Sequence, residues 1–178
     1  MKPIVSDQFK RAIEAKRQEA LARIERVPIA VLVWGPSPTS GSPMAEIRVQ
    51  LRDSLSQRGH LADFSEDLFD PASPLSNLAQ QVAQAEAYDI IFSMPSSFGA
   101  VGEIHDFARL QGIAHKLIAF VDQAHVNGYS PQSLMATQTS ASCKIEVYSA
   151  SDLPGCIIDK ALDQVRRLQE LMYLSGRR

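Results

Sequence analysis

The stretch Ile29-Ala-Val-Leu-Val-Trp34-Gly-Pro-Ser-Pro-Thr-Ser-Gly-Ser-Pro43 joins a continuous apolar run to a loop rich in glycine, proline and serine. The apolar run has the length of a strand but lacks the alternation of a strand with one face in water. Such a run is typical of a strand buried on both faces, as in a parallel sheet. The residues that follow favour neither helix nor strand. The stretch therefore predicts a buried first strand that ends in a long loop.

Strand and helix signals alternate along the rest of the chain. The further strands are expected at 60–64, 88–94, 116–121 and 144–149, and the helices at 44–58, 75–87, 100–111 and 157–174. Gly59 and Gly112 are expected to end two of these helices. The alternation predicts an α/β fold, a five-stranded parallel sheet of order 2-1-3-4-5 with helices on both faces, the flavodoxin-like three-layer sandwich. Segment 122–143 shows only a short helical signal near 131–137 and a loop that can cover the site.

An extra helix is expected before the first strand. Residues 6–26 are rich in Lys, Arg and Glu, and their apolar residues fall near helical spacing: Phe9, Ile13, Ala20, Ile24 and Val27. The chain thus divides into an N-terminal helix, residues 1–27, and an α/β domain, residues 28–178. The helix either packs on the domain or lies at an oligomer interface, and we expect a homo-oligomer.

Composition excludes several classes of protein. The chain has 178 residues, 45% of them hydrophobic, and a formal net charge of −2. That size supports a full core without disulfides, and the absence of a basic patch argues against nucleic-acid binding. The apolar runs are too short to span a membrane, and the charged N-terminus lacks the pattern of a secretory signal. We therefore expect a cytoplasmic protein in which Cys143 and Cys156 are reduced thiols, with no metal site and no resident cofactor.

The predicted topology gives a position for a ligand. Open α/β sheets bind ligands beyond the carboxyl ends of their strands, where the strand order reverses. For the order 2-1-3-4-5 this point lies between strands 1 and 3, next to the loops 35–43 and 95–99. The candidate substrate-binding residues at this edge are Trp34, Gly35, Pro36, Ser37, Glu66, Asp67, Ser96, Ser97, Gly99 and Asp106.

Most of these residues also have a purely structural interpretation. Trp34 either stacks on a base or is simply a buried aromatic side chain. Glu66 and Asp67 either bind ribose hydroxyls or form a solvated acidic loop. Arg48 and Arg52 of the helix at 44–58 are expected in surface ion pairs, with a phosphate contact as the alternative. Asp89 begins the third strand at the opposite edge and is expected to be structural.

The common catalytic motifs are missing. The chain has no G-x-G-x-x-G after the first strand, no phosphate-binding loop that ends in G-K-S/T, and no G-x-S-x-G turn. Ser96 and Ser97 precede a helix, but no histidine is placed as their base. Carboxylates are therefore the best candidates for the chemistry.

Glu103 is the leading candidate among them. It follows the third strand and is expected in the first turn of the helix at 100–111, where the helix dipole favours an ionised carboxylate. Such a group can act as a nucleophile or stabilise a developing cation. The alternative is that Glu103 only complements the helix dipole. Ala100 stands where a capping box requires Ser or Thr, which weakens that alternative.

Two segments resemble a known family. Trp34-Gly35-Pro36 is similar to the Gly-Pro turn of nucleoside 2-deoxyribosyltransferases, and Asp89-Ile-Ile-Phe…Ser97-Phe-Gly99-Ala-Val-Gly-Glu103…Phe107-Ala108 resembles the segment of that family that carries its catalytic glutamate. Related TIR-type NAD-hydrolysing domains share the fold and the glutamate, and lysine-decarboxylase-like phosphoribohydrolases carry a similar turn. The resemblance covers residues 29–108.

The resemblance implies a retaining reaction at an N-glycosidic bond. Glu103 matches the family nucleophile, which attacks C1′ of a ribose or deoxyribose while the base leaves. The loop at 35–37 matches the base or sugar contact, and Ser97 and Gly99 match the contacts to sugar hydroxyls or a phosphate. Glu66 or Asp67 matches the residues that orient the nucleoside.

The implied substrate is a nucleoside, a nucleotide or NAD, with hydrolysis and transfer both open. Ala100 and Asp106 depart from the Thr and Gly of the family pattern, so the substrate stays unassigned. Two alternatives to an enzyme are a non-catalytic nucleotide-sensing domain that uses the same crevice, and a structural module in which the N-terminal helix matters most.

Overall fold

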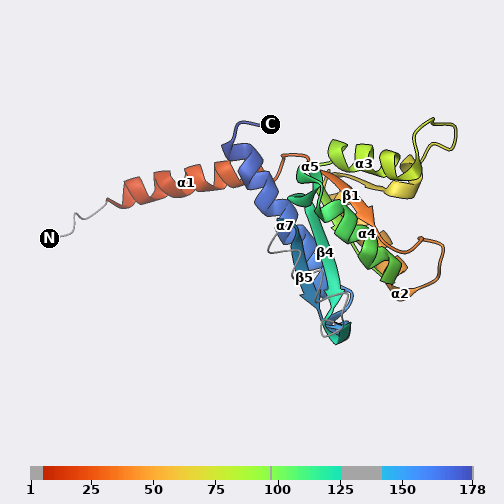
Figure 1. Cartoon of the computed structure of the whole chain (residues 1–178). Helices are drawn as coiled ribbons and strands as arrows, with labels where there is room; N and C mark the ends of the chain where they lie inside the picture. The colour runs from red at the N-terminus through yellow and green to blue at the C-terminus, as the bar shows by residue number, and fades with distance from the viewer. Residues whose placement is uncertain (1–5, 97, 126–141, 178) are drawn as a thin grey trace.

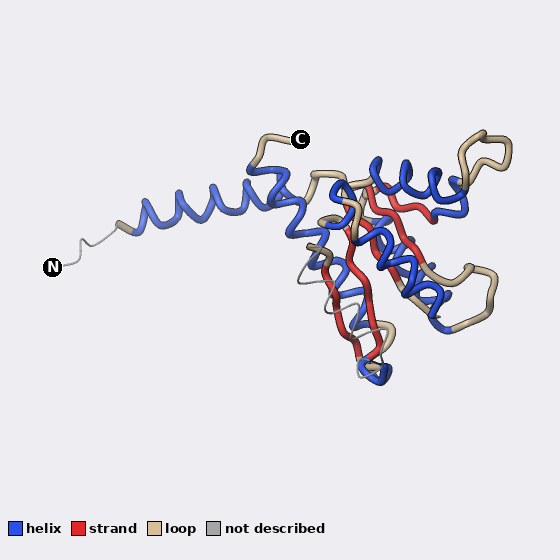
Figure 2. The backbone as a smooth tube through the Cα atoms, in the orientation of Figure 1, coloured by secondary structure: helices blue, strands red, loops and turns tan. Residues whose placement is uncertain are grey.

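A five-stranded parallel sheet forms the centre of the computed structural model (Figures 1 and 2). The strand order is β2-β1-β3-β4-β5, as the sequence predicts. The strands are β1 (Ala30–Trp34), β2 (Leu61–Phe64), β3 (Ile90–Ser93), β4 (Leu117–Asp122) and β5 (Lys144–Tyr148). The structure describes residues 6–96, 98–125 and 142–177, without the side chains of Phe98, Glu103 and His125. The predicted helix at 131–137 lies outside the described residues.

Helices cover both faces of the sheet, which confirms the three-layer prediction. One face packs against α2 (Pro43–Gln57) and α7 (Gly155–Leu174), and the other against α3 (Asn77–Ala87), α4 (Phe98–Ala108) and α5 (Gln111–Ala114). Within the described ranges, short 3₁₀ turns connect elements at η1 (Ser65–Leu68), η2 (Gln123–His125) and η3 (Ala150–Asp152).

The unbroken apolar runs reflect this double cover. In β1, Val31 and Val33 belong to the core beneath α2 and α7, whereas Leu32 belongs to the core beneath α3, α4 and α5. All four residues of β3 are buried. Both faces of the sheet are shielded from water, so apolar side chains are favoured on both. The strands therefore lack the polar/apolar alternation of a strand that has one face in water.

The helix boundaries follow from local chemistry. Ser6, Ser42 and Ser76 cap the starts of α1 (Asp7–Ile24), α2 and α3, because each serine hydroxyl accepts a hydrogen bond from the backbone N–H three residues later. Gly59 follows α2 with a φ of +84°, which confirms it as the end signal.

The expected stop at Gly112 is wrong. α4 ends at Ala108, and Gly112 lies inside the separate short helix α5. Leu110 is extended between them, with φ −84° and ψ 110°, and this extended residue interrupts the helix. The break allows α5 to turn and bury Ile113 and Ala114 against the sheet. Burial therefore overrides the continuous helical pattern.

α1 differs from the other long helices because it buries none of its residues. In Figure 1 it runs away from the sheet, and only its C-terminal end lies near α7. Gln169 of α7 fixes the exit of α1, since its amide nitrogen donates to the carbonyls of Glu25 at 3.2 Å and Val27 at 2.8 Å. Among the described helices, none combines the length and the hydropathy needed to cross a bilayer.

Candidate functional site

The candidate site lies at the carboxyl edge of the sheet, where the strand order reverses. β1 pairs with β2 on one side and with β3 on the other. Val33 is beside Phe64 in the first ladder, and Trp34 is beside Ser93 in the second. The loops that follow β1, β2 and β3 therefore start at one edge, and this is the position at which open α/β sheets bind ligands.

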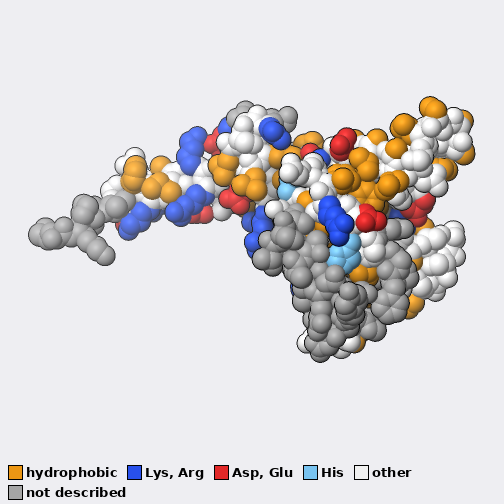
Figure 3. All heavy atoms as spheres, in the orientation of Figure 1, with side chains coloured by type: hydrophobic (Ala, Val, Ile, Leu, Met, Phe, Trp, Pro, Cys, Tyr) orange, Lys and Arg blue, Asp and Glu red, His pale blue; other side chains and the backbone are white. Residues whose placement is uncertain are grey.

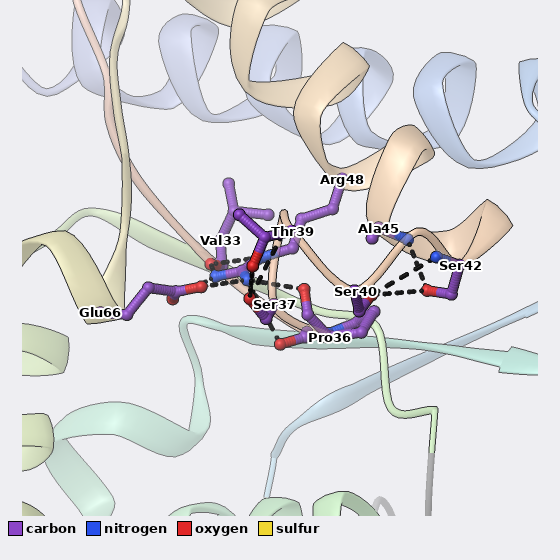
Figure 4. A network of polar contacts seen from close by, with 10 residues as sticks. Val33, Pro36, Ser37, Thr39, Ser40, Ser42, Ala45, Arg48 and Glu66 are labelled. Carbon is purple, nitrogen blue, oxygen red and sulfur yellow. Dashed lines mark hydrogen bonds and ion pairs between the residues drawn. The ribbon is translucent and has the colours of Figure 1, made fainter.

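Arg48 of α2 is a buried charge at this edge, with 0% of its side chain exposed. Its Nε and Nη2 donate to the carbonyl of Val33, at 3.2 and 2.6 Å. Its Nη1 donates to the carbonyls of Gly35 at 3.3 Å and Pro36 at 2.9 Å. One guanidinium thus ties the end of β1 to the start of the following loop (Figure 4).

The same guanidinium holds Glu66 of η1 in a two-pronged ion pair. Nη1 lies 2.6 Å from Oε1, and Nη2 lies 2.7 Å from Oε2 (Figure 4). The Arg48 Cζ also lies 4.2 Å from the centre of the Phe64 ring, which stacks against it. A planar fork suits a carboxylate in this geometry. The carboxylate of Glu66 is therefore oriented by the interior of the protein, although 42% of its side chain is exposed.

The environment keeps Glu66 ionised. Burial raises the pKa of the Glu66 carboxyl, but the hydrogen bonds and charge of Arg48 outweigh it and hold the pKa below its ordinary value. An ionised carboxylate has about four lone-pair directions, more than Arg48 uses. Glu66 can therefore accept hydrogen bonds from a ligand while Arg48 holds it.

Gly35 allows the close packing around Arg48. A Cβ at this position would lie 3.1 Å from Arg48 Cδ and 3.3 Å from both Cβ and the carbonyl oxygen of Met94. Contacts this short require the neighbours to move, and Arg48 is fixed by its hydrogen bonds. The glycine in the predicted Gly-Pro turn thus has a packing reason.

Hydroxyl groups pair along the loop between β1 and α2. The Ser37 and Thr39 oxygens are 3.0 Å apart, and the Ser40 and Ser42 oxygens are 3.1 Å apart. Ser42 also caps α2, because it accepts a hydrogen bond from Ala45 N–H at 3.2 Å. The loop is therefore organised from both ends, with Ser37 exposed beside Pro36 (Figure 4).

Trp34 lies at the end of β1 and contacts α4 at this edge. Its ring packs on Phe107 of α4, with the ring centres 4.6 Å apart and the planes tilted by 48°. The indole Nε1 is buried, and no described residue accepts its hydrogen. Trp34 is thus an aromatic side chain shared between the core and the end of β1.

Glu103 lies in the second turn of α4, so its expected first-turn position is wrong. α4 begins at Phe98, two residues earlier than predicted, and has no acidic residue in its first turn. The helix dipole acts mainly on the first turn, so its support for the carboxylate is weaker than expected. Position 103 lies about one helical turn before Phe107, nearer to the start of α4.

Asp67, Ser96 and Gly99 follow the ends of β2 and β3, whereas Asp106 lies near the C-terminal end of α4, away from this edge. Asp67 is exposed in η1, and Ser96 is exposed between β3 and α4. The backbone of Gly99 lies in the first turn of α4, and Ser97 lies outside the described residues. Asp106 is exposed on α4.

The described part of the chain offers no group of three or more His, Cys, Asp or Glu side chains that could hold a metal ion. Cys143 is buried and Cys156 is partly buried, and both are free thiols. Burial raises the pKa of the Cys143 thiol, which keeps it protonated. The carboxylates and backbone groups at the sheet edge therefore remain the chemistry-bearing groups.

Comparison with known proteins adds no assignment. Neither the scan against models of protein families nor the search of characterised proteins finds a match to this chain.

Sequence reasoning missed the role of Arg48. The expectation of a surface ion pair is wrong, because the side chain is fully buried. The signal was its spacing: Arg48 lies three residues before Leu51 and seven before Leu55, on the buried stripe of α2. Asp89 is structural as predicted, since its carboxylate accepts the Ala30 N–H at 2.8 Å.

Proposed function

We propose that this protein is an N-glycosidase-like enzyme that cleaves or transfers the N-glycosidic bond of a nucleoside, a nucleotide or NAD. Glu103 is the proposed nucleophile, and Glu66 is the proposed acceptor for the sugar hydroxyls. The loop at 35–37 and Trp34 form the proposed surface against the base or sugar. The protein requires no resident cofactor in this proposal, since NAD enters as substrate, and its reduced thiols fit a cytoplasmic protein.

The proposed reaction has two displacements at C1′. The Glu103 carboxylate forms a bond to C1′, and the base leaves with the electron pair of the N-glycosidic bond. Water or a second base then attacks C1′, the ester bond breaks, and the carboxylate is regenerated. The transition states are oxocarbenium-like, so a carboxylate stabilises them as well as attacking.

The single observation that supports this proposal best is the fixed carboxylate of Glu66 at the reversal point of the sheet. Arg48 uses both of its terminal nitrogens to orient Glu66, and the same group positions the carbonyls of Gly35 and Pro36. A preset acceptor loses little entropy when it binds hydroxyl groups. Ribose presents its 2′ and 3′ hydroxyls side by side, which suits one exposed carboxylate.

The second candidate is a non-catalytic nucleotide-binding or sensing domain that uses the same crevice. The start of α4 at Phe98 favours it, because the helix dipole then supports the Glu103 carboxylate less than in a first-turn position. Binding through Glu66 and the loop at 35–37 does not depend on Glu103.

Base release separates the two candidates. The protein is incubated with NAD, with nucleoside monophosphates and with deoxynucleosides, alone and with a second free base, and released base is measured by chromatography. The variants are Glu103→Gln and Glu66→Gln, and Glu170→Gln is the matched control, an exposed carboxylate of α7 outside the candidate site.

An enzyme is expected to release base from at least one of these compounds. Glu103→Gln is expected to lower kcat by at least about 100-fold, since loss of an activated nucleophile removes the covalent step. Glu66→Gln is expected mainly to raise KM, and Glu170→Gln to change neither constant. Binding of these nucleotides by the wild-type protein without any base release would reject the enzyme and support the sensing domain.

A further inference from the structure

α1 presents apolar and basic side chains to solvent along its whole length. Phe9 is 57% exposed and Ile13 is also exposed. The helix carries five basic and three acidic residues, a net charge of +2, within a chain whose net charge is −2. An isolated helix of 18 residues is only marginally stable in water, and this one gains little from burial.

A shallow hollow runs along this helix. Its floor is apolar and its edge is basic, and its lining residues are Phe9, Ala12, Ile13, Lys16, Arg17 and Ala20. Figure 3 shows orange and blue side chains side by side on α1. The hollow therefore suits an apolar partner surface that carries negative charge.

Such a surface exists on the same chain. We call it the acidic patch and define it by the exposed residues Asp67, Leu68, Phe69, Asp70, Leu75 and Leu78. Residues 66–78 contain three acidic and no basic side chains. Leu75 and Leu78 are 51% and 57% exposed. Exposed apolar patches of this kind on a folded protein mark interaction sites.

The acidic patch is ordered by a buried side chain. Gln80 of α3 accepts the Asp70 N–H at 3.0 Å, and its amide nitrogen donates to the carbonyls of Asp70 at 3.1 Å and Leu75 at 3.3 Å. One side chain thus fixes both arms of the loop between η1 and α3. A preformed surface loses less entropy on binding than a flexible loop.

α1 and the acidic patch lie at opposite ends of the molecule (Figure 1), so they cannot touch within one chain. We propose that α1 of one copy docks on the acidic patch of a second copy, in a head-to-tail contact. Basic residues around the hollow meet Asp67 and Asp70, and the apolar floor covers Leu75 and Leu78. A heterologous contact of this type closes into a ring or continues as a chain of subunits. The test below measures assembly and not base release, so its outcome is separate from that of the proposed enzyme activity.

Charge argues against a symmetric pairing of two α1 helices. Lys16 and Arg17 of the hollow each pair with a glutamate of their own helix, Glu19 and Glu14, but each α1 still has a net charge of +2, which a pair of α1 helices would bring together. Like charges across an interface are destabilising. The acidic patch offers the opposite sign.

The test is the mass of the full-length protein as a function of concentration, by sedimentation velocity. The α1 variant is Phe9→Asp with Ile13→Asp, and the patch variant is Leu75→Asp with Leu78→Asp. All four side chains are exposed, so the fold is expected to persist. Leu171→Asp, an exposed leucine of α7 outside both surfaces, is the matched control.

The wild type and the control are expected to assemble, and each double variant alone is expected to raise the dissociation constant at least about tenfold. Mixing the two double variants is expected to restore a 1:1 dimer, because one supplies an intact patch and the other an intact α1. A salt concentration of about 1 M, where the Debye length is about 3 Å, is expected to weaken assembly.

Three outcomes overturn the proposal. A wild type that is monomeric at all concentrations rules out assembly through these two surfaces. A patch variant that still assembles while the α1 variant does not indicates α1–α1 pairing. A mixture of the two double variants that stays monomeric rules out the head-to-tail contact.

Discussion

The Arg48–Glu66 cluster and α1 place their charged side chains in opposite environments. In the cluster, one buried guanidinium has three backbone carbonyls, a carboxylate and an aromatic ring around it. In α1, the paired charged side chains lie three or four residues apart and are exposed to water. Surface pairs contribute at most about 1 kcal/mol each, whereas breaking a buried pair costs several kcal/mol. A buried charged residue of this protein is therefore expected to stabilise the fold, whereas an exposed one contributes little to its stability.

The largest expected effect comes from Arg48→Met. The change leaves the carbonyl of Val33 and the carboxylate of Glu66 without their donor, and we expect a loss of about 3 kcal/mol in the free energy of unfolding, measured by urea denaturation. Arg52→Met is the matched control from the next turn of α2, whose ion pair with Asp53 is more exposed. Equal stability of Arg48→Met and the wild type would show that the cluster is dispensable.

Gly35→Ala is expected to cost about 1–3 kcal/mol, because the new methyl group crowds Arg48 and Met94. Gly102→Ala is the control, since a Cβ at that position of α4 meets no atom within 4 Å. It is expected to stabilise the protein by about 0.5–1 kcal/mol through helix propensity. Equal midpoints of thermal unfolding for the two variants would contradict the crowding argument.

Glu66→Gln isolates the charge in the cluster. We expect a loss of about 1 kcal/mol at neutral pH, a modest value because solvent screens the half-exposed carboxylate. The pKa of Glu66 is lowered in the folded protein. Its stabilising effect is therefore present above the unfolded pKa of about 4.3 and is lost as the pH falls below it.

Urea denaturation of the wild type and Glu66→Gln from neutral to acidic pH measures this effect. The two stabilities are expected to converge as the pH falls below about 4, while other groups lower both together. A constant difference between the two proteins over this range would mean that the charge of Glu66 does not matter.

The smallest effect is expected from deleting residues 1–24. This deletion removes α1 but keeps Glu25 and Val27, which Gln169 holds. Because α1 buries no residue, the free energy of unfolding of the remaining domain is expected to change by less than about 1 kcal/mol. Circular dichroism during urea titration of a dilute sample measures this. A large loss of stability would place α1 in the folding unit of the domain.

The fold was predictable because its signals are local and repeated. Each strand is a short apolar run, each crossover helix follows it, and the order of the sheet is the one expected from that alternation. The break between α4 and α5 was not predictable. It results from the burial of Ile113 and Ala114 in the core, and the local sequence contains no residue that indicates a break there.

The candidate site was predictable in position but not in its organisation. The edge between β1 and β3 follows from topology, and Glu66 lies there as expected. Arg48 lies 18 residues before Glu66 in the chain, and only the parallel pairing of β1 and β2 brings them together. The position of Arg48 on the apolar stripe of α2 was the sequence signal for its burial, and the expectation of a surface ion pair disregarded this signal.

The hydrogen bonds of Gln169 have a consequence for biosynthesis. Gln169 joins α7 to the carbonyls of Val27 and Glu25, 142 and 144 residues earlier in the chain. The direction of α1 is therefore set only after α7 has been made and has docked. A growing chain on the ribosome therefore has an α1 helix whose orientation is not fixed until α7 has been made and has docked.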